Sequence, residues 1–125
     1  MRTRETVIGL MSGTSADGVD AALVEIESHD DQLRVSCLAH LTLPYPRVLT
    51  EQILAACSPD TGRVDLICEL NFRLAEEFSR AALAVAERAG VPISKIDLIG
   101  SHGQTIYHVP RPSGGTHCLR TTGAT

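Results

Sequence analysis

An apolar stripe at helical spacing in the second half of the chain constrains the fold more than any other feature of the sequence. Its members recur every three or four residues and are Val64, Ile67, Leu70, Leu74, Phe78, Ala81 and Val85. Gly90 follows the stripe, and glycine commonly ends a helix because it adopts the left-handed conformation without strain. Thr61 precedes the stripe as a candidate N-cap. We therefore expect a long helix that packs one face on a sheet.

Alternating segments before this helix supply the strands of that sheet. Residues 6–11 form an apolar, β-branched run, residues 20–27 alternate, and residues 33–41 alternate again after a polar turn at 29–32. We expect these three segments to pair as a meander. Leu49, Ile53 and Leu54 recur at helical spacing within residues 48–57, which predicts a short helix.

A further apolar strand is expected at residues 96–100, after the long helix. A strand in that position commonly joins the sheet through a crossover, so the fold class is α/β, with a mixed sheet of a β-meander and crossover helices. Residues 101–104 are expected to form a loop at the C-terminal end of this strand. Ligands gather at that end of open α/β sheets, because the loops there expose backbone donors.

A dense cluster of glycine, hydroxyl and carboxylate residues separates the first two expected strands. The candidate phosphate-binding residues are Gly13, Thr14, Ser15, Ala16, Asp17, Gly18, Val19 and Asp20. Glycine lets the backbone approach an anion, and consecutive N–H groups form an anion-binding nest. A Mg²⁺ ion that arrives with ATP could be held by Asp17 or Asp20. A plain hairpin turn is the alternative, and the segment lacks the G-K-[ST] of a Walker loop.

A second polar cluster follows the strand at residues 96–100. The candidate sugar-binding residues are His102, Gly103, Gln104 and Thr105. Their imidazole, amide and hydroxyl groups suit several hydrogen bonds to sugar hydroxyls. A histidine that is simply hydrogen-bonded in place is the alternative.

Composition limits which partners and which cellular compartment are expected. The formal net charge is −4 and the basic residues are scattered, so nucleic acid is not an expected partner. No stretch approaches a membrane span or the apolar region of a signal peptide. The cysteines lack a C-x-x-C pair, and three of them sit in apolar patterns typical of a core; they are Cys37, Cys57, Cys68 and Cys118. A reduced, cytoplasmic location is expected.

A zinc site near the C-terminus is not expected. The spacing of the available ligands matches neither C-x-x-C nor H-x-x-x-H. Those ligands are His102, His108, His117 and Cys118. No metal ligand is therefore assigned from spacing.

Two segments together closely resemble the anhydro-N-acetylmuramic acid kinases. They are residues 8–20, IGLMSGTSADGVD, and residues 100–108, GSHGQTIYH, separated by the long helix. The resemblance implies the first lobe of a two-lobed, actin-like (ribonuclease H-like) ATPase fold, with nucleotide and sugar bound between the lobes. It implies that residues 13–20 contact the ATP phosphates and that residues 102–105 face the sugar, with Thr105 as a direct contact.

The reaction implied by the resemblance opens the 1,6-anhydro ring with water and moves the ATP γ-phosphate to O6. The product is N-acetylmuramic acid 6-phosphate, in the recycling of cell-wall peptidoglycan. In this chemistry an aspartate takes a proton from the attacking water. The cofactors implied are ATP and Mg²⁺, and the substrate is a small amino sugar.

The resemblance ends before the chain does. The family's Asp-Thr-Gly-Pro-Gly stretch, which holds the catalytic base, has no counterpart before Thr125, and residues 113–125 depart from the family pattern. We therefore expect residues 1–125 to be a truncated N-terminal lobe that is inactive alone, with no catalytic residue assigned. Alternatives are a noncatalytic binding module that dimerises through apolar surface, and another sugar kinase or ATPase of the actin-like superfamily.

Overall fold

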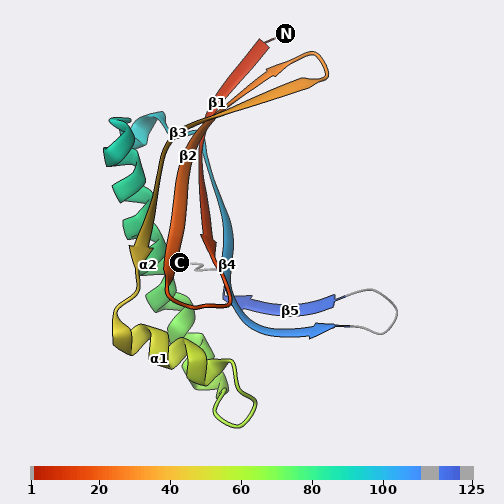
Figure 1. Cartoon of the computed structure of the whole chain (residues 1–125), viewed down its shortest axis with the longest axis vertical. Coiled ribbons are helices and arrows are strands. Elements are labelled where there is room, and N and C mark those ends of the chain that lie inside the picture. Colours follow the sequence, from red (N-terminus) through yellow and green to blue (C-terminus); the bar gives the residue numbers. More distant parts are fainter. Residues whose placement is uncertain (1, 111–115, 122–125) are drawn as a thin grey trace.

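The computed structural model describes residues 2–110 and 116–121, which form one sheet with helices (Figure 1). In chain order the elements are β1 (Arg2–Ser12), β2 (Gly18–His29), β3 (Gln32–Pro44), α1 (Arg47–Ala56), α2 (Val64–Ala89), a 3₁₀ turn η1 (Ile93–Lys95), β4 (Leu98–Pro110) and β5 (Thr116–Thr121). The expected meander, short helix, long helix and following strand are all present. Neither described helix has an apolar stretch long enough to span a bilayer.

The five strands form a mixed sheet in the order β3-β2-β1-β4-β5. Strands β1, β2 and β3 pair antiparallel, β4 joins β1 in parallel, and β5 returns antiparallel along β4. The parallel pairing follows from the helices between β3 and β4, which carry the chain back to the starting end of the sheet. The α/β class is confirmed.

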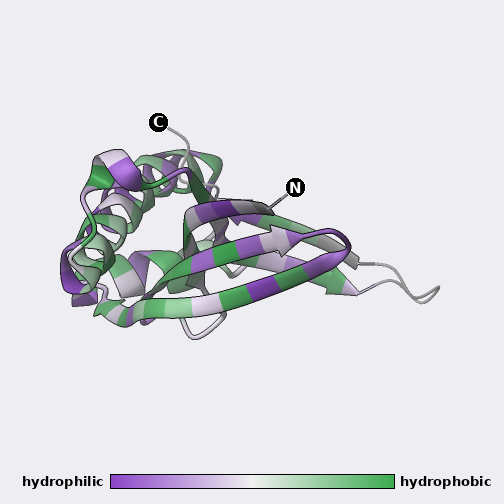
Figure 2. Cartoon of the chain, turned by 90° about the horizontal axis from the view of Figure 1, so that it is seen from above, coloured by the Kyte–Doolittle hydropathy of each residue, from purple (hydrophilic) through white to green (hydrophobic). Residues whose placement is uncertain are grey.

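Both helices lie on the same side of the sheet (Figure 2). The stripe of α2 is buried from Leu70 to Val85, while Ile67 is half-buried and Val64 is exposed. It packs against alternate residues of the meander, among them Ile8, Ala21 and Leu23. On α1, Leu49 and Ile53 complete this core, whereas Leu54 faces solvent. The predicted packing of the long helix on a sheet is thus confirmed.

The two ends of α2 differ in how well the sequence predicted them. Gly90 follows the helix with a φ of 67°, as a C-terminal glycine should. The N-terminal prediction was wrong, because Arg63 and not Thr61 precedes the first turn, and no side chain caps it. Thr61 instead donates its hydroxyl to the carbonyl of Ala55 at 2.6 Å and closes the connection after α1.

The prediction of a loop at residues 101–104 is also wrong, because β4 continues through these residues to Pro110. Glycine and polar residues at 101–104 had indicated that the strand ends at residue 100. In the structure, Gly103 takes a φ of 76° and the β1–β4 register shifts between Leu10 and Ser12, so the polar run is a bulge within a continuous strand.

The cysteines were also misread. Cys57 is partly buried, and Cys37, Cys68 and Cys118 are exposed, so none belongs to the fully buried core. Cys68 lies on the exposed face of α2, and Cys37 and Cys118 lie at exposed positions of β3 and β5. All the cysteines are free thiols.

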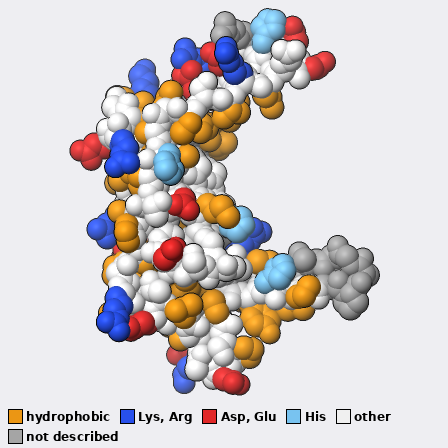
Figure 3. Space-filling view, viewed as in Figure 1, with side chains coloured by type: hydrophobic (Ala, Val, Ile, Leu, Met, Phe, Trp, Pro, Cys, Tyr) orange, Lys and Arg blue, Asp and Glu red, His pale blue; other side chains and the backbone are white. Residues whose placement is uncertain are grey.

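The far ends of the sheet extend past the helices. Leu33 and Val35, on the β2–β3 ribbon, are 73% and 62% exposed, although their segment alternates like a half-buried strand. Figure 3 shows a hollow on the side away from the helices, between this ribbon and the β4–β5 hairpin, with hydrophobic side chains along its walls. Alternation therefore predicted the strands but not which parts of them are covered.

A leucine pair on α2 tests the packing of this helix. Leu74 is fully buried, so Leu74→Ala should lower the free energy of unfolding by about 2–5 kcal/mol through lost burial and a cavity. Leu83 is 57% exposed on the same helix, and Leu83→Ala should change it by less than about 0.5 kcal/mol. Urea denaturation of both variants measures the difference, and equal losses would contradict the assigned faces.

Candidate functional site

The glycine-rich segment between β1 and β2 is a tight turn over residues 13–17. The N–H of Ala16 donates to the carbonyl of Gly13 at 3.2 Å, and Ala16 itself has a φ of 52°. Thr14, Ser15 and Asp17 are exposed, and the Ser15 hydroxyl donates to Asp17 Oδ1 at 3.0 Å. In the part of the chain that the structure describes, the N–H groups of Thr14 and Ser15 have no hydrogen-bond partner. The turn therefore offers consecutive donors to an anion.

The end of β3 fixes the other side of this turn. The backbone N–H of Tyr45 donates to the carbonyl of Asp17 at 2.9 Å. At Gly18, a Cβ atom would lie 2.5 Å from the carbonyl oxygen of Leu43, so the backbones approach at a distance that only glycine permits. Gly18 is thus required for packing, whichever ligand the turn binds.

Gln104 joins β4 to the turn. Its side chain is fully buried, and its Nε2 donates to the carbonyls of Gly13 at 2.9 Å and Thr105 at 3.1 Å. Its Oε1 lies 2.6 Å from the hydroxyl of Ser12 and 3.3 Å from that of Tyr45. Protein carbonyls take both donors of the Gln104 amide, and its Oε1 accepts from Tyr45 or from the single hydroxyl proton of Ser12. The side chain of Gln104 is thus directed into the protein, and both of its amide protons are bonded there.

Ser12 and Tyr45 belong to this site, and the sequence analysis did not assign them to it. Ser12 is fully buried and its Oγ also lies 2.7 Å from the carbonyl oxygen of Gly18. A signal for it existed, because Ile8, Leu10 and Ser12 share one face of β1, which places a hydroxyl in a row of core residues. Tyr45 stands between two prolines, and no pattern in the sequence connects it with the turn.

Burial raises the pKa of Tyr45 to about 12. The hydrogen bond with Ser12 opposes this rise, while the charges of Glu77 and Asp17 add to it. The phenol is therefore neutral over the physiological range and is a hydrogen-bond donor there.

The remaining predicted residues divide between the two strands. His102 is exposed, with Nδ1 3.4 Å from the carbonyl oxygen of Gly103, and Thr105 is half-buried. Val19 is fully buried in the core, and Asp20 accepts a hydrogen bond from Thr42 at 2.5 Å on the exposed face of β2. Hydrogen bonds thus connect residues 13 and 17–18 with residues 104–105, directly or through Ser12 and Tyr45. Val19 and Asp20 are outside this hydrogen-bond network.

Among the described residues, no group of three or more histidine, cysteine, aspartate or glutamate side chains is placed to hold a metal ion. The side chain of His117 lies outside the described part of the chain. Asp17 presents an exposed carboxylate beside the free N–H groups of the turn, which suits a Mg²⁺ ion held mainly by phosphates and water.

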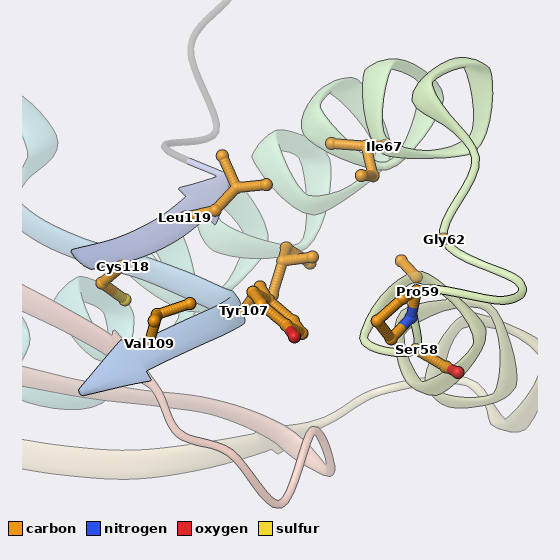
Figure 4. Close-up of a pocket in the computed structure, with 10 residues that line it drawn as sticks. Ser58, Pro59, Gly62, Ile67, Tyr107, Val109, Cys118 and Leu119 are labelled. Carbon is orange, nitrogen blue, oxygen red and sulfur yellow. The ribbon is translucent and has the colours of Figure 1, made fainter. Parts of the chain in front are cut away.

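A separate cavity of ≈ 540 Å³ lies between the α1–α2 connection and the β4–β5 hairpin (Figure 4). Its lining is mostly apolar and consists of Ala56, Ser58, Pro59, Gly62, Ile67, Ile106, Tyr107, Val109, Cys118 and Leu119. None of residues 13–20 or 102–105 lines it. The predicted phosphate and sugar residues are therefore not the walls of this cavity.

The raised pKa of Tyr45 predicts a specific loss of stability in alkali. Above pH 10.0 the phenol ionises in the unfolded chain, but in the folded chain it stays neutral until about pH 12. The folded state binds more protons in this window, so the free energy of unfolding should fall as the pH rises through it. Denaturation at stepped pH should show a shallower fall in Tyr45→Phe, and Tyr107→Phe is the control. The same fall in Tyr45→Phe as in the parent chain would contradict the prediction.

Comparison with known proteins shows what this chain is similar to. A family model described as anhydro-N-acetylmuramic acid kinase matches residues 5–122. Proteins named anhydro-N-acetylmuramic acid kinase are 48% identical over 104 residues in Caldanaerobacter subterraneus subsp. tengcongensis and 43% identical over 112 residues in Salinibacter ruber. These alignments cover 83% and 90% of this chain but only 26% and 28% of the relatives. The chain thus spans about a quarter of the length of these relatives, and it belongs to the anhydro-N-acetylmuramic acid kinase family.

Proposed function

We propose that this chain supplies the ATP-phosphate turn and part of the sugar-facing surface of an ATP-dependent kinase for 1,6-anhydro-N-acetylmuramic acid. The observation that carries the proposal is the turn at residues 13–17, whose free N–H groups and hydroxyls face solvent while Gln104 ties it to the strand bearing His102 and Thr105. In this proposal the fold is the first lobe of an actin-like ATPase. A mixed five-stranded sheet with helices is compatible with such a lobe.

The phosphate side rests on the chemistry of the turn. Thr14 and Ser15 each present a backbone N–H and a hydroxyl, and the exposed Asp17 can bind a Mg²⁺ ion through its waters. When bound, MgATP would supply the γ-phosphoryl group. The chain's own residues would hold the phosphates in place, which is the main protein contribution to phosphoryl transfer.

The sugar side rests on the outer groups of β4. The imidazole of His102 is exposed, and Thr105 is half-buried beside the bulge at Gly103. These groups can donate to and accept from sugar hydroxyls. With Gln104 occupied by the protein, we assign the sugar contacts to His102 and Thr105, and the reaction is proposed to yield N-acetylmuramic acid 6-phosphate in the cytoplasm, where ATP is available.

Binding, not turnover, is the test suited to this chain, since its 125 residues contain no Asp-Thr-Gly-Pro-Gly stretch. Isothermal titration with MgATP should detect binding by the parent chain. Removing both turn hydroxyls in Thr14→Ala/Ser15→Ala should weaken it about tenfold or more, because each lost hydrogen bond to a charged group costs about 1.5 kcal/mol or more. Ser79→Ala, an exposed hydroxyl on α2, is the matched control and should leave the affinity unchanged.

A second titration with 1,6-anhydro-N-acetylmuramic acid separates the alternatives. Sugar binding that weakens in His102→Ala and Thr105→Ala supports the proposed sugar side. Sugar binding without nucleotide binding would favour a noncatalytic binding module instead. Absence of binding for both ligands would overturn the proposal for this chain.

A further inference from the structure

The carbonyl oxygens around the glycine turn are held by inward-facing donors. The carbonyl of Gly13 accepts from Gln104 Nε2 at 2.9 Å, and that of Asp17 accepts from the N–H of Tyr45 at 2.9 Å. The carbonyl of Gly18 lies 2.7 Å from the hydroxyl of Ser12. These donors come from β1, from β4 and from the residue after β3, so three parts of the fold meet at one turn.

The hydrogen bond from Gln104 decides which end of the Gly13–Thr14 peptide group faces an anion. A carbonyl oxygen repels phosphate, whereas a peptide N–H attracts it. With the carbonyl of Gly13 bound to Gln104, the N–H of Thr14 in the same peptide group is left on the exposed surface, and the N–H of the next residue, Ser15, lies beside it. The donors behind the turn, which do not contact the phosphate, thus set the polarity of the surface that faces it.

The partners of Gln104 strongly favour one of the two orientations of its side-chain amide. Rotating its amide by half a turn would place Oε1 against the carbonyl oxygens of Gly13 and Thr105, and two acceptors would then face each other in a buried site. Its Oε1 has two available donors, the hydroxyls of Ser12 and Tyr45. When the single proton of Ser12 goes to the carbonyl of Gly18, Tyr45 still donates to Gln104.

We infer that Gln104 is a positioning residue, which with Ser12 and Tyr45 fixes the turn so that its N–H groups bind phosphate. Gln104 acts through Gly13 and does not contact the sugar. This inference rests on the proposed phosphate site, and it assigns Gln104 to the nucleotide side although His102 and Thr105, on the same strand, are assigned to the sugar side.

The experiment measures two dissociation constants in one set of variants. Gln104→Leu keeps a side chain of similar size but removes every polar atom, so MgATP should bind about tenfold more weakly, the loss of roughly 1.4 kcal/mol. The dissociation constant for 1,6-anhydro-N-acetylmuramic acid should stay within about twofold of the parent value, a change of less than 0.5 kcal/mol. The opposite split, with the sugar weakened and MgATP unchanged, would overturn the inference.

Milder variants keep the test usable if Gln104→Leu does not fold. Tyr45→Phe and Ser12→Ala each remove one donor to Oε1, and the remaining donor can replace it. Each should weaken MgATP binding by a few-fold, and the double variant should lose more than the two single losses combined. Tyr107→Phe removes an exposed phenol from β4 and should change neither dissociation constant. Additive losses, or no loss in the double variant, would contradict the inference.

A measurement without ligand separates this inference from the proposed function. The N–H groups of Ala16 and Tyr45 are hydrogen-bonded to the carbonyls of Gly13 and Asp17, so their hydrogen exchange reports the order of the turn. Exchange at both should be at least several-fold faster in Gln104→Leu, or in Tyr45→Phe/Ser12→Ala, while exchange within α2 is unchanged. If the parent chain binds no MgATP, the proposed function fails, and unchanged exchange at Ala16 and Tyr45 would separately overturn the positioning role.

Discussion

The packing of α2 against the antiparallel meander is the interaction on which the rest of the structure depends. Leu70, Leu74, Phe78, Ala81 and Val85 are buried against one face of β1, β2 and β3. An antiparallel ribbon has little stability alone, and it becomes fixed when an amphipathic helix covers one face. The same helix returns the chain so that β4 can join β1 in parallel, which is how two distant polar segments become neighbours.

The candidate site is built where that core meets the ends of the strands. On β1 the core row continues from Ile8 and Leu10 to Ser12, and the buried Gln104 stands opposite in the register of β4. Buried polar groups are costly unless every hydrogen bond is made, and here the groups of Gln104 are all paired. A satisfied polar cluster of this kind can hold a loop more specifically than apolar packing, because its partners must match in direction as well as in size.

The sequence predicted the elements well and their environment less well. Periodicity located the meander and both helices, because side-chain alternation and helical spacing follow directly from backbone geometry. It misread residues 101–104 as a loop, since glycine and polar residues also occur at a bulge inside a strand. Burial at Leu33 and Val35 depended on how far the helices extend over the sheet, which local patterns do not encode.

The site itself was only partly accessible from sequence. The composition of residues 13–18 pointed to a turn that can face an anion, and the structure has a turn there with two N–H groups that find no partner among the described residues. Tyr45 could not be found, because its role depends on a tertiary contact between the residue after β3 and the β1–β2 turn. Gln104 was among the predicted residues, but the sequence does not show that it lies on the buried face of β4.

One consequence concerns the order in which this chain folds during synthesis. The contacts of Gln104 with Ser12 and Gly13 span 92 and 91 residues. Contacts so distant in sequence form late, because closing a long loop has an entropic cost and the ribosome must first have released β4. The β1–β2 hairpin can pair early, yet its turn is expected to reach its final conformation only after β4 docks beside β1. A nascent chain that ends before β4 would therefore display the glycine motif without the hydrogen bonds from Gln104 that hold its carbonyls.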